Sequence, residues 1–191
     1  ESYVFNQSYK IDALSTYMKM LTVTSGILVM FSSSKYLKFI KIFKIEYPIL
    51  ILSAILGMMV MISSNDLIVF YLGLEIQAMS LYVLASFNRE NIFSTESGVK
   101  FFVLSALSSG LLLYGCSLIY GFSGSTNFNS ISVNNLFDAK YGITFGIVFI
   151  LVGLSFKISA VPFHMWAPDV YQGSPTSVTV LFAILPKIAA L

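Results

Sequence analysis

Three charged residues lie within stretches of the chain that are otherwise apolar enough to cross a lipid bilayer: Glu75, Lys157 and Lys187. A charge at the centre of a membrane helix costs about 2.5–3.5 kcal/mol on insertion scales, so such residues are rare and usually face a polar pathway. One carboxylate and two amines can bind and release protons, and no other reactive chemistry surrounds them. The pattern therefore indicates a path for protons or ions.

The composition identifies an integral membrane protein. Of the 191 residues, 57% are hydrophobic and only 10% are charged, whereas soluble domains carry about 25% charged residues. The net charge of +2 is small and the lysines form no stripe, so no nucleic-acid partner is expected. With one cysteine, Cys116, and one histidine, His164, the chain lacks the ligands for a zinc site or an iron–sulfur cluster. No metal site is expected.

Five stretches are long and apolar enough to be membrane helices, and a sixth is cut short. They cover approximately residues 13–31, 48–62, 67–87, 99–121, 141–166 and 177–191. We therefore predict an all-α fold, a polytopic membrane helix bundle of about six helices. At 1.5 Å per residue the last stretch reaches roughly 21 Å, so the chain as given is expected to end inside the membrane. It is then a fragment, or one half of a split polypeptide that a second chain completes after Leu191.

The charges between the spans predict an orientation. The segment after the first span contains four lysines against a single acid, namely Lys35, Lys38, Lys41, Lys44 and Glu46. The next loop has no cation, and the third contains Arg89. Because loops rich in Lys and Arg stay on the inner side of a membrane, the lysine-rich segment is expected on the matrix or cytoplasmic side.

Glu75 has two interpretations. A lone carboxylate in a low-dielectric setting takes up a proton unless a cation or water lies nearby. Helical spacing places Tyr71, Met79 and Tyr82 on its face. The functional interpretation is a proton-carrying acid, and the alternative is a structural ion pair or an acid close to the interface.

Lys157 precedes Pro162, which lacks a backbone N–H and clashes with the preceding turn, so the fifth helix is predicted to break just beyond the lysine. Broken helices within membranes line cavities, and transporters use them as ion sites. Lys187 follows Pro186 in the last stretch. The alternative for both lysines is that their side chains extend to the membrane surface.

Two further residues are weaker candidates. Lys100 follows Glu96 by four residues, which is a favourable spacing for a helical ion pair and gives it a structural alternative. His164 lies in a segment rich in aromatic residues and proline, where a structural role competes with a role in proton relay.

Several short runs follow one another in a fixed order from about residue 12 onward. They are EYPIL (46–50), SNDL (64–67), YLGLE (71–75), STESG (94–98), FK (156–157) and PFHMWAPDVYQG (162–173). Together they resemble the family of subunit 2, called subunit N in bacteria, of respiratory complex I, the proton-pumping NADH:quinone oxidoreductase. Single short motifs coincide by chance, but this many in order do not.

The resemblance implies an antiporter-like fold of about fourteen helices built from two inverted repeats, each with a broken helix. Residues 1–191 would then be a single transmembrane domain that contains most of the first repeat and lacks the second. On matching positions, Glu75 resembles the family's pathway glutamate, Lys157 the lysine at the first broken helix, and Lys187 the central lysine one helix later. Lys100 matches a further lysine of the first repeat.

The resemblance also implies the function. The chain would be a non-redox, proton-translocating membrane-arm subunit, in which quinone reduction elsewhere alters the pairing of Glu75 with Lys157 and sends a proton on to Lys187. NAD, FMN, iron–sulfur clusters and ubiquinone would be bound by other subunits, and no cofactor by this chain. The partners would be other membrane-arm subunits, including the neighbouring antiporter-like ones, and membrane lipids.

Two alternatives stay open: a stand-alone Mrp-type cation/proton antiporter, and a structural or assembly subunit whose charges only hold helices together. The location also has two interpretations. Ten of the eleven basic residues are lysine, as in an AT-rich organellar gene. This composition favours the mitochondrial inner membrane over a bacterial plasma membrane.

Overall fold

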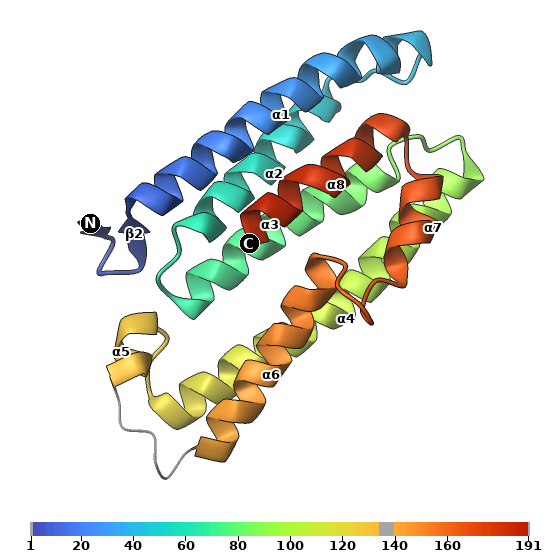
Figure 1. Ribbon diagram of the computed structural model, residues 1–191. Helices are drawn as coiled ribbons and strands as arrows, with labels where there is room; N and C mark the ends of the chain where they lie inside the picture. Colours follow the sequence, from blue (N-terminus) through green and yellow to red (C-terminus); the bar gives the residue numbers. More distant parts are fainter. Residues whose placement is uncertain (1, 134–139, 191) are drawn as a thin grey trace.

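The computed structural model describes residues 2–133 and 140–190, which form eight helices and one two-stranded sheet (Figure 1). The helices are α1 (Ala13–Phe39), α2 (Glu46–Ile62), α3 (Leu67–Ala85), α4 (Ile92–Ser123), α5 (Phe128–Val133), α6 (Lys140–Lys157), α7 (Trp166–Gly173) and α8 (Thr176–Ala190). The strands are β1 (Ser2–Val4) and β2 (Tyr9–Ile11), paired antiparallel with Ser2 opposite Ile11. The predicted helix bundle is confirmed, and the short hairpin is an addition to it.

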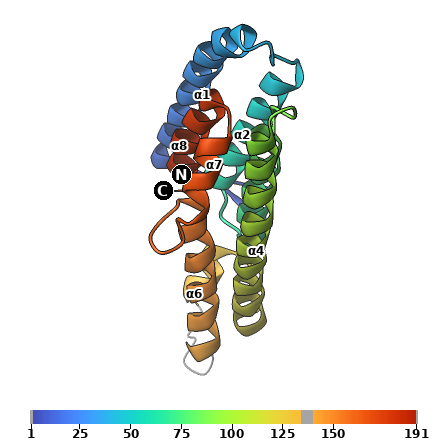
Figure 2. The ribbon, with the colours of Figure 1, turned by 90° about the vertical axis from the view of Figure 1, so that its right-hand side faces the viewer.

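The long helices run side by side in an elongated bundle (Figures 1 and 2). Helix α2 packs along α3, and α8 lies against α1 and α2. Helix α4 packs along α6 and α7, and its contact with α3 joins the two groups. Helices α6 and α7 pack one after the other along α4 and together form a broken helix (Figure 1).

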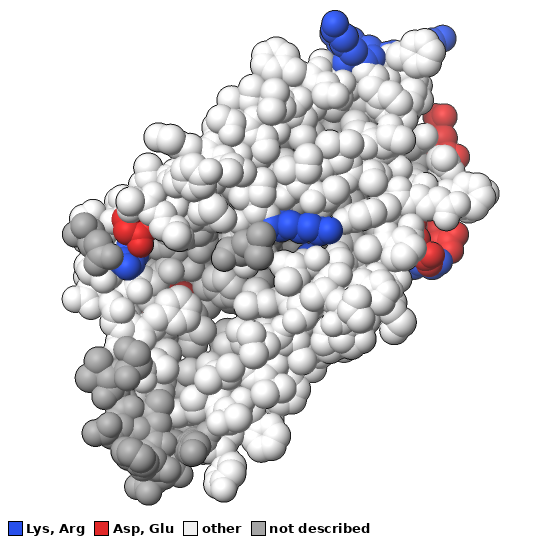
Figure 3. All heavy atoms as spheres, viewed as in Figure 1, with Lys and Arg blue, Asp and Glu red and all other residues white. Residues whose placement is uncertain are grey.

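The surface of the bundle fits a lipid environment. Helices α1, α3 and α4 are each long and apolar enough to cross a membrane, and α2, α8 and most of α6 are shorter apolar helices. In the space-filling view, most charged side chains lie toward the ends of the molecule, and the surface between them is largely uncharged apart from one basic side chain near its centre (Figure 3). This distribution is expected of helices whose middle parts face hydrocarbon.

The interruption of the fifth predicted helix is confirmed. Helix α6 ends at Lys157, and the chain resumes as α7 only at Trp166. Ser159 has a φ of 60°, a left-handed conformation that few non-glycine residues adopt and that cannot continue a helix. The backbone carbonyl oxygen of Phe156, at the end of α6, accepts hydrogen bonds from the Ser159 N–H at 3.1 Å and from the Trp166 indole Nε1 at 2.9 Å, and the second bond ties the start of α7 to the end of α6.

Two predicted helix boundaries were wrong. Helix α4 begins at Ile92 rather than near residue 99, because Asn91 caps it: the Asn91 Oδ1 accepts a hydrogen bond from the Phe93 N–H at 3.0 Å. Helix α1 continues to Phe39 rather than ending near residue 31, so Lys35 and Lys38 lie on the helix and only Lys41 and Lys44 lie in the connection. In both cases polar residues that suggested a loop belong to a helix.

Two other helices begin as local capping rules predict. Asp66 caps α3 by accepting from the Ile68 N–H at 2.8 Å, and Pro48 lies in the first turn of α2. Asp66 also accepts a hydrogen bond from Thr126 Oγ1 at 2.5 Å, which ties the start of α3 to the segment before α5.

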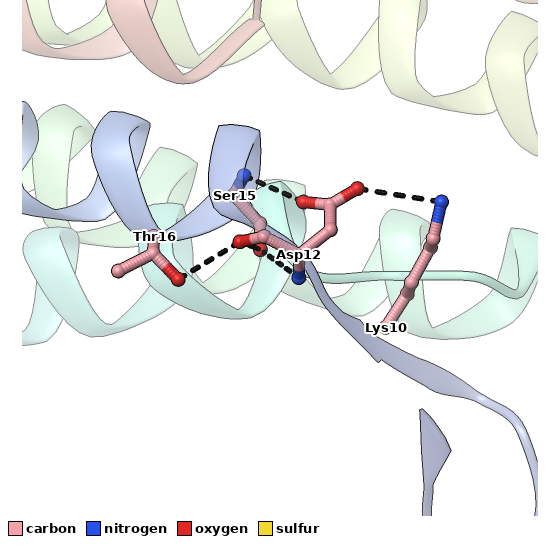
Figure 4. A network of polar contacts seen from close by, with 4 residues as sticks. All are labelled: Lys10, Asp12, Ser15 and Thr16. Atoms are coloured by element: carbon pink, nitrogen blue, oxygen red, sulfur yellow. Dashed lines mark hydrogen bonds and ion pairs between the residues drawn. The ribbon is translucent and has the colours of Figure 1, made fainter. Parts of the chain in front are cut away.

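Asp12 caps α1 through a reciprocal network (Figure 4). Its Oδ1 accepts from the Ser15 N–H at 2.7 Å, while the Ser15 Oγ accepts from the Asp12 N–H at 3.0 Å. Lys10 Nζ lies 3.3 Å from Oδ2. The hydrogen bonds from Ser15, with a smaller effect of Lys10, hold the pKa of the Asp12 carboxyl below its ordinary value. The cap therefore contributes its full stabilisation at any pH above the ordinary pKa of aspartate. This contribution is lost only as the pH falls through the lowered pKa of Asp12.

Helices α2 and α3 approach closely through two glycines. A Cβ added to Gly57 would lie 2.5 Å from the Gln77 backbone nitrogen and 2.7 Å from the Gly73 carbonyl oxygen. A Cβ added to Gly73 would lie 2.7 Å from the Met61 nitrogen. Because these neighbours are backbone atoms, a side chain at either position would force the helices apart.

We predict that Gly57→Ala in the full-length subunit lowers the free energy of unfolding by about 1–3 kcal/mol, the usual cost of overpacking. The thermal stability of the purified complex and the amount of subunit in membranes measure this. Gly110→Ala is the matched control, because nothing lies within 4 Å of its added Cβ. Equal stability of the two variants would show that the α2–α3 contact is not tight.

Candidate functional site

The Lys157 side chain points into the bundle at the end of α6. Its Nζ donates a hydrogen bond to the Ser105 Oγ on α4 at 2.6 Å. The Tyr82 hydroxyl on α3 donates to the same oxygen at 2.8 Å. Ser105 is fully buried, and Tyr82 is nearly so. A partly buried amine is therefore joined to two buried hydroxyls contributed by two other helices.

Glu75 lies on α3, two turns before Tyr82. The Glu75 Oε1 is buried and has no hydrogen-bond partner among the described residues. No ion pair within 4.0 Å joins it to Lys157 in this part of the chain. In this conformation the acid and the amine make no direct contact, and Ser105 and Tyr82 supply the hydrogen-bonding groups next to the amine.

A small cavity continues from Lys157 toward α8. It has a volume of about 20 Å³ and is lined by residues of five helices, namely Gln77, Ala78, Leu81, Phe101, Ser105, Lys157, Trp166, Phe182 and Pro186. This volume is enough for about one water molecule. Gln77 is 3% exposed, and its Oε1 has no hydrogen-bond partner among the described residues. The cavity thus has polar groups from α3, α4 and α6 on its walls and extends to the residue before Lys187.

Lys187 lies in the last turn of α8. It is eleven residues after Thr176, the first residue of α8, or roughly 16 Å at 1.5 Å per residue. The Lys187 Nζ lies 5.9 Å from the centre of the Tyr171 ring, and the side chain is half-buried. A cation placed over an aromatic face in this way is stabilised by the ring electrons. The Lys187 amine is therefore stabilised next to α7, and part of its side chain stays exposed.

The structure does not bring Lys100 to this cluster. Its side chain is 43% exposed, and Nζ lies 2.8 Å from Glu96 Oε1 and 2.8 Å from Asp169 Oδ2. The predicted pair with Glu96 is confirmed. Asp169 lies in the first turn of α7 and ties that helix to α4.

His164 is also apart from the cluster. It lies exposed in the segment between α6 and α7, and no described residue forms a hydrogen bond with its side chain. Its backbone carbonyl oxygen accepts from the Ala167 N–H at 3.0 Å, at the start of α7. Its role in proton relay stays a prediction, and its position supports the structural alternative.

Sequence reasoning missed Ser105 and Gln77 as members of the site. A signal for Ser105 was present, because serines recur on one face of α4 and the structure buries them: Ser94, Ser97, Ser105, Ser108 and Ser109. Small polar residues on one face of a membrane helix mark a face that packs against other helices. No comparable signal singles out Gln77 beyond its position two residues after Glu75.

Residues 64–191, about two thirds of the chain, match the model of a transmembrane family described as NADH:quinone oxidoreductase/Mrp antiporter. The chain belongs to this family. Among curated relatives, it is 70% identical over 188 residues to the NADH-quinone oxidoreductase subunit N of Pelagibacter ubique. That alignment covers 98% of this chain and 40% of the relative, so the chain spans less than half the length of the subunit that it matches.

Solved structures give the same fold. A chain of respiratory complex I from Thermus thermophilus, with bound aureothin, matches with a TM-score of 0.80 and 31% identity over 98% of this chain and 40% of that one. A chain of the Mrp complex from Dietzia matches with a TM-score of 0.74 and 23% identity over 90% of this chain and 33% of that one, which shows a shared fold alone. The antiporter-like fold and the multi-pass membrane architecture are thereby confirmed.

The relative from Pelagibacter and the structure from Thermus are both bacterial. They fit the bacterial alternative for the location and give no support to the mitochondrial interpretation drawn from lysine usage.

We predict that Ser105→Ala destabilises this family member, because it leaves the Lys157 amine and the Tyr82 hydroxyl without their shared acceptor. An unsatisfied buried polar group costs about 1–3 kcal/mol. Thermal unfolding of the purified complex measures the effect. Ser177→Ala is the control, since the buried Ser177 hydroxyl has no hydrogen-bond partner among the described residues and its removal should cost little. An equal, small effect of both substitutions would contradict a supporting role of Ser105.

Proposed function

We propose that this chain forms part of a proton-translocating membrane-arm subunit of NADH-quinone oxidoreductase, with Glu75, Lys157 and Lys187 as its proton-carrying groups. One observation carries the proposal. The Lys157 amine ends a broken helix inside the bundle and is hydrogen-bonded to a hydroxyl that also accepts from Tyr82, and Glu75, two turns before Tyr82 on α3, has a buried Oε1 without a partner among the described residues. The sequence relatives named subunit N support the same assignment.

The hydrogen bonds suit proton transfer because their direction can reverse. When Lys157 is protonated, its Nζ donates to Ser105, as in the structure. After Lys157 loses a proton, its lone pair can accept the Ser105 hydroxyl hydrogen while Tyr82 continues to donate to Ser105. A proton arriving from the side of Glu75 and Tyr82 can therefore reach Lys157 with only small shifts of heavy atoms.

The exit from Lys157 runs toward Lys187. The cavity beside Lys157 can hold about one water molecule and reaches Pro186, the neighbour of Lys187. Quinone reduction in other subunits would change the distance between Glu75 and Lys157 and so the proton affinity of the amine. Interacting groups titrate as a set, so the three residues act together. Each charge moved against the membrane potential requires about 2.3 kcal/mol per 100 mV.

The rest of the assignment follows from this role. The electron carriers and ubiquinone would be bound by other subunits of the complex, and this chain would bind no cofactor. Residues 1–191 would correspond to most of the first inverted repeat of the fold. The partners would be the neighbouring antiporter-like subunits and a chain segment that supplies the second repeat. The end of the bundle that carries Lys44 and Arg89 would face the cytoplasm.

A stand-alone Mrp-type antiporter is the second candidate, favoured by the shared fold with the Mrp complex. The difference in identity favours the first candidate, since the chain is 70% identical to a subunit N and 23% identical to the matched chain of the Mrp complex. Purification of the tagged full-length chain from its native membrane separates the two. Co-purification of NADH-oxidising activity supports the first candidate, and its absence supports the second.

We predict that Lys157→Met, introduced into the full-length subunit of an assembled complex, lowers quinone-dependent proton pumping several-fold while the complex still assembles. Methionine keeps the length of the side chain and removes the proton-binding group. Proton uptake by vesicles during NADH oxidation measures the effect. Lys35→Met, on the exposed face of α1, is the control and should pump normally. Normal pumping by the Lys157 variant would remove this lysine from the mechanism.

The double variant Glu75→Gln, Lys157→Met tests the remaining alternative, a purely structural role of the charges. Both replacements preserve approximate size and remove both charges together, so a structural subunit would assemble and pump as before. The proposal expects normal assembly with a strong loss of pumping, measured as above and compared with subunit content in the membrane. Full pumping in this variant would favour the structural alternative.

A further inference from the structure

A second cavity lies at the end of the bundle where α2 begins and α3 ends. Its volume is about 310 Å³, and it is lined by Lys44, Glu46, Ile49, Leu50, Val83, Ser86, Phe87 and Arg89. Helices α2 and α3 run side by side in opposite directions (Figure 1), which brings the segment before α2 next to the segment after α3. None of these residues belongs to the proton-carrying group described above.

The walls of this cavity change from charged to apolar along the helices. Lys44 and Arg89 are exposed and lie outside the helices, at the end of the bundle. Ile49, one turn into α2, and Val83, near the end of α3, are 59% and 45% exposed. The cavity therefore has a cationic mouth at the membrane surface and a hydrophobic wall that continues toward the hydrocarbon.

The two cations have no protein partner in the described part of the chain. Neither Lys44 nor Arg89 lies within 4.0 Å of a described carboxylate, and the ion pairs found there belong to Lys10 and Lys100. Glu46 also lines the cavity, so the three charges sum to +1. A guanidinium and an ammonium at one mouth offer charge-assisted hydrogen bonds to a phosphate.

We propose that this cavity binds an anionic phospholipid, with its phosphate at Lys44 and Arg89 and the first part of an acyl chain against Ile49, Leu50 and Val83. Basic pockets between membrane helices on the cytoplasmic side bind anionic lipid head groups, and each nearby cation adds to the attraction. A free phosphate would use the cations but leave the apolar wall exposed, whereas a phospholipid uses both. The site does not depend on the proton-carrying role of Lys157.

The test uses the purified complex with the full-length chain and a phosphatidylglycerol analogue that carries a photoactivatable group on its acyl chain. After illumination, mass spectrometry should find labelled peptides from α2 and α3. In Lys44→Gln, Arg89→Gln this labelling should fall about tenfold or more, because two cations near the surface are lost. The control Lys35→Gln, Lys41→Gln removes two exposed cations of the same end that do not line the cavity, and it should label normally.

Three further arms make the result decisive. The matching phosphatidylcholine analogue should label these peptides weakly, and excess inorganic phosphate should not suppress labelling by phosphatidylglycerol. If the double variant does not assemble, Lys44→Gln and Arg89→Gln singly should each lower labelling several-fold, while Arg89→Lys keeps more of it. Equal labelling by both lipids, loss of labelling with phosphate, an equal loss in the control, or unchanged labelling in both single variants would overturn the proposal.

Discussion

The structure depends on one constraint: an amine placed within a membrane helix bundle must find polar partners inside the protein. Lys157 meets this constraint at the point where its own helix stops. The end of α6 frees backbone carbonyl groups, and Trp166 donates to one of them from the start of α7. The amine itself is bound by Ser105, which Tyr82 also binds. The end of α6, Ser105 and Tyr82 thus form one arrangement. Its hydrogen bonds offset the free energy that burying these polar groups would otherwise cost.

This arrangement explains why α4 carries so many serines. A small side chain allows α4 to approach its neighbours closely, and its hydroxyl can still satisfy a buried polar group. Ser94 donates to the Ala85 carbonyl oxygen of α3 at 2.9 Å, and Ser108 donates to the Gly153 carbonyl oxygen of α6 at 3.2 Å. Ser105 holds the amine between these two contacts along the same helix. Helix α4 therefore connects the two groups of helices through hydroxyl groups and not only through apolar packing.

Much of this could be predicted from the sequence, and the remainder has identifiable reasons. The apolar spans, the break before Pro162 and the Asp66 cap follow from local rules of length, backbone chemistry and capping. The start of α4 did not follow, although the Asn91 cap is a local signal, because the polar run that comes next resembles a loop; in the structure Ser94 and Ser97 are satisfied by the Ala85 carbonyl oxygen of α3. The pairing of Glu75 with Lys157 was expected from the resemblance to the complex I family, and the two form no ion pair within 4.0 Å among the described residues. Which hydroxyl lies beside the amine depends on how α3, α4 and α6 pack, and this packing cannot be predicted from the sequence of any single helix.

The glycine contact between α2 and α3 has a mechanical consequence. Backbone atoms of the two helices touch at Gly57 and Gly73, and the Gln77 nitrogen belongs to the same contact. Sliding or tilting one helix against the other would force main-chain atoms together, so the pair must behave as a single rigid body. Glu75 and Gln77 are carried on that pair. Lys157 is carried on a second pair built in the same way, because a Cβ added to Gly115 of α4 would lie 2.7 Å from the Gly146 carbonyl oxygen of α6. A change in the spacing of acid and amine is therefore expected to move one pair of helices against the other, at the contact of α3 with α4.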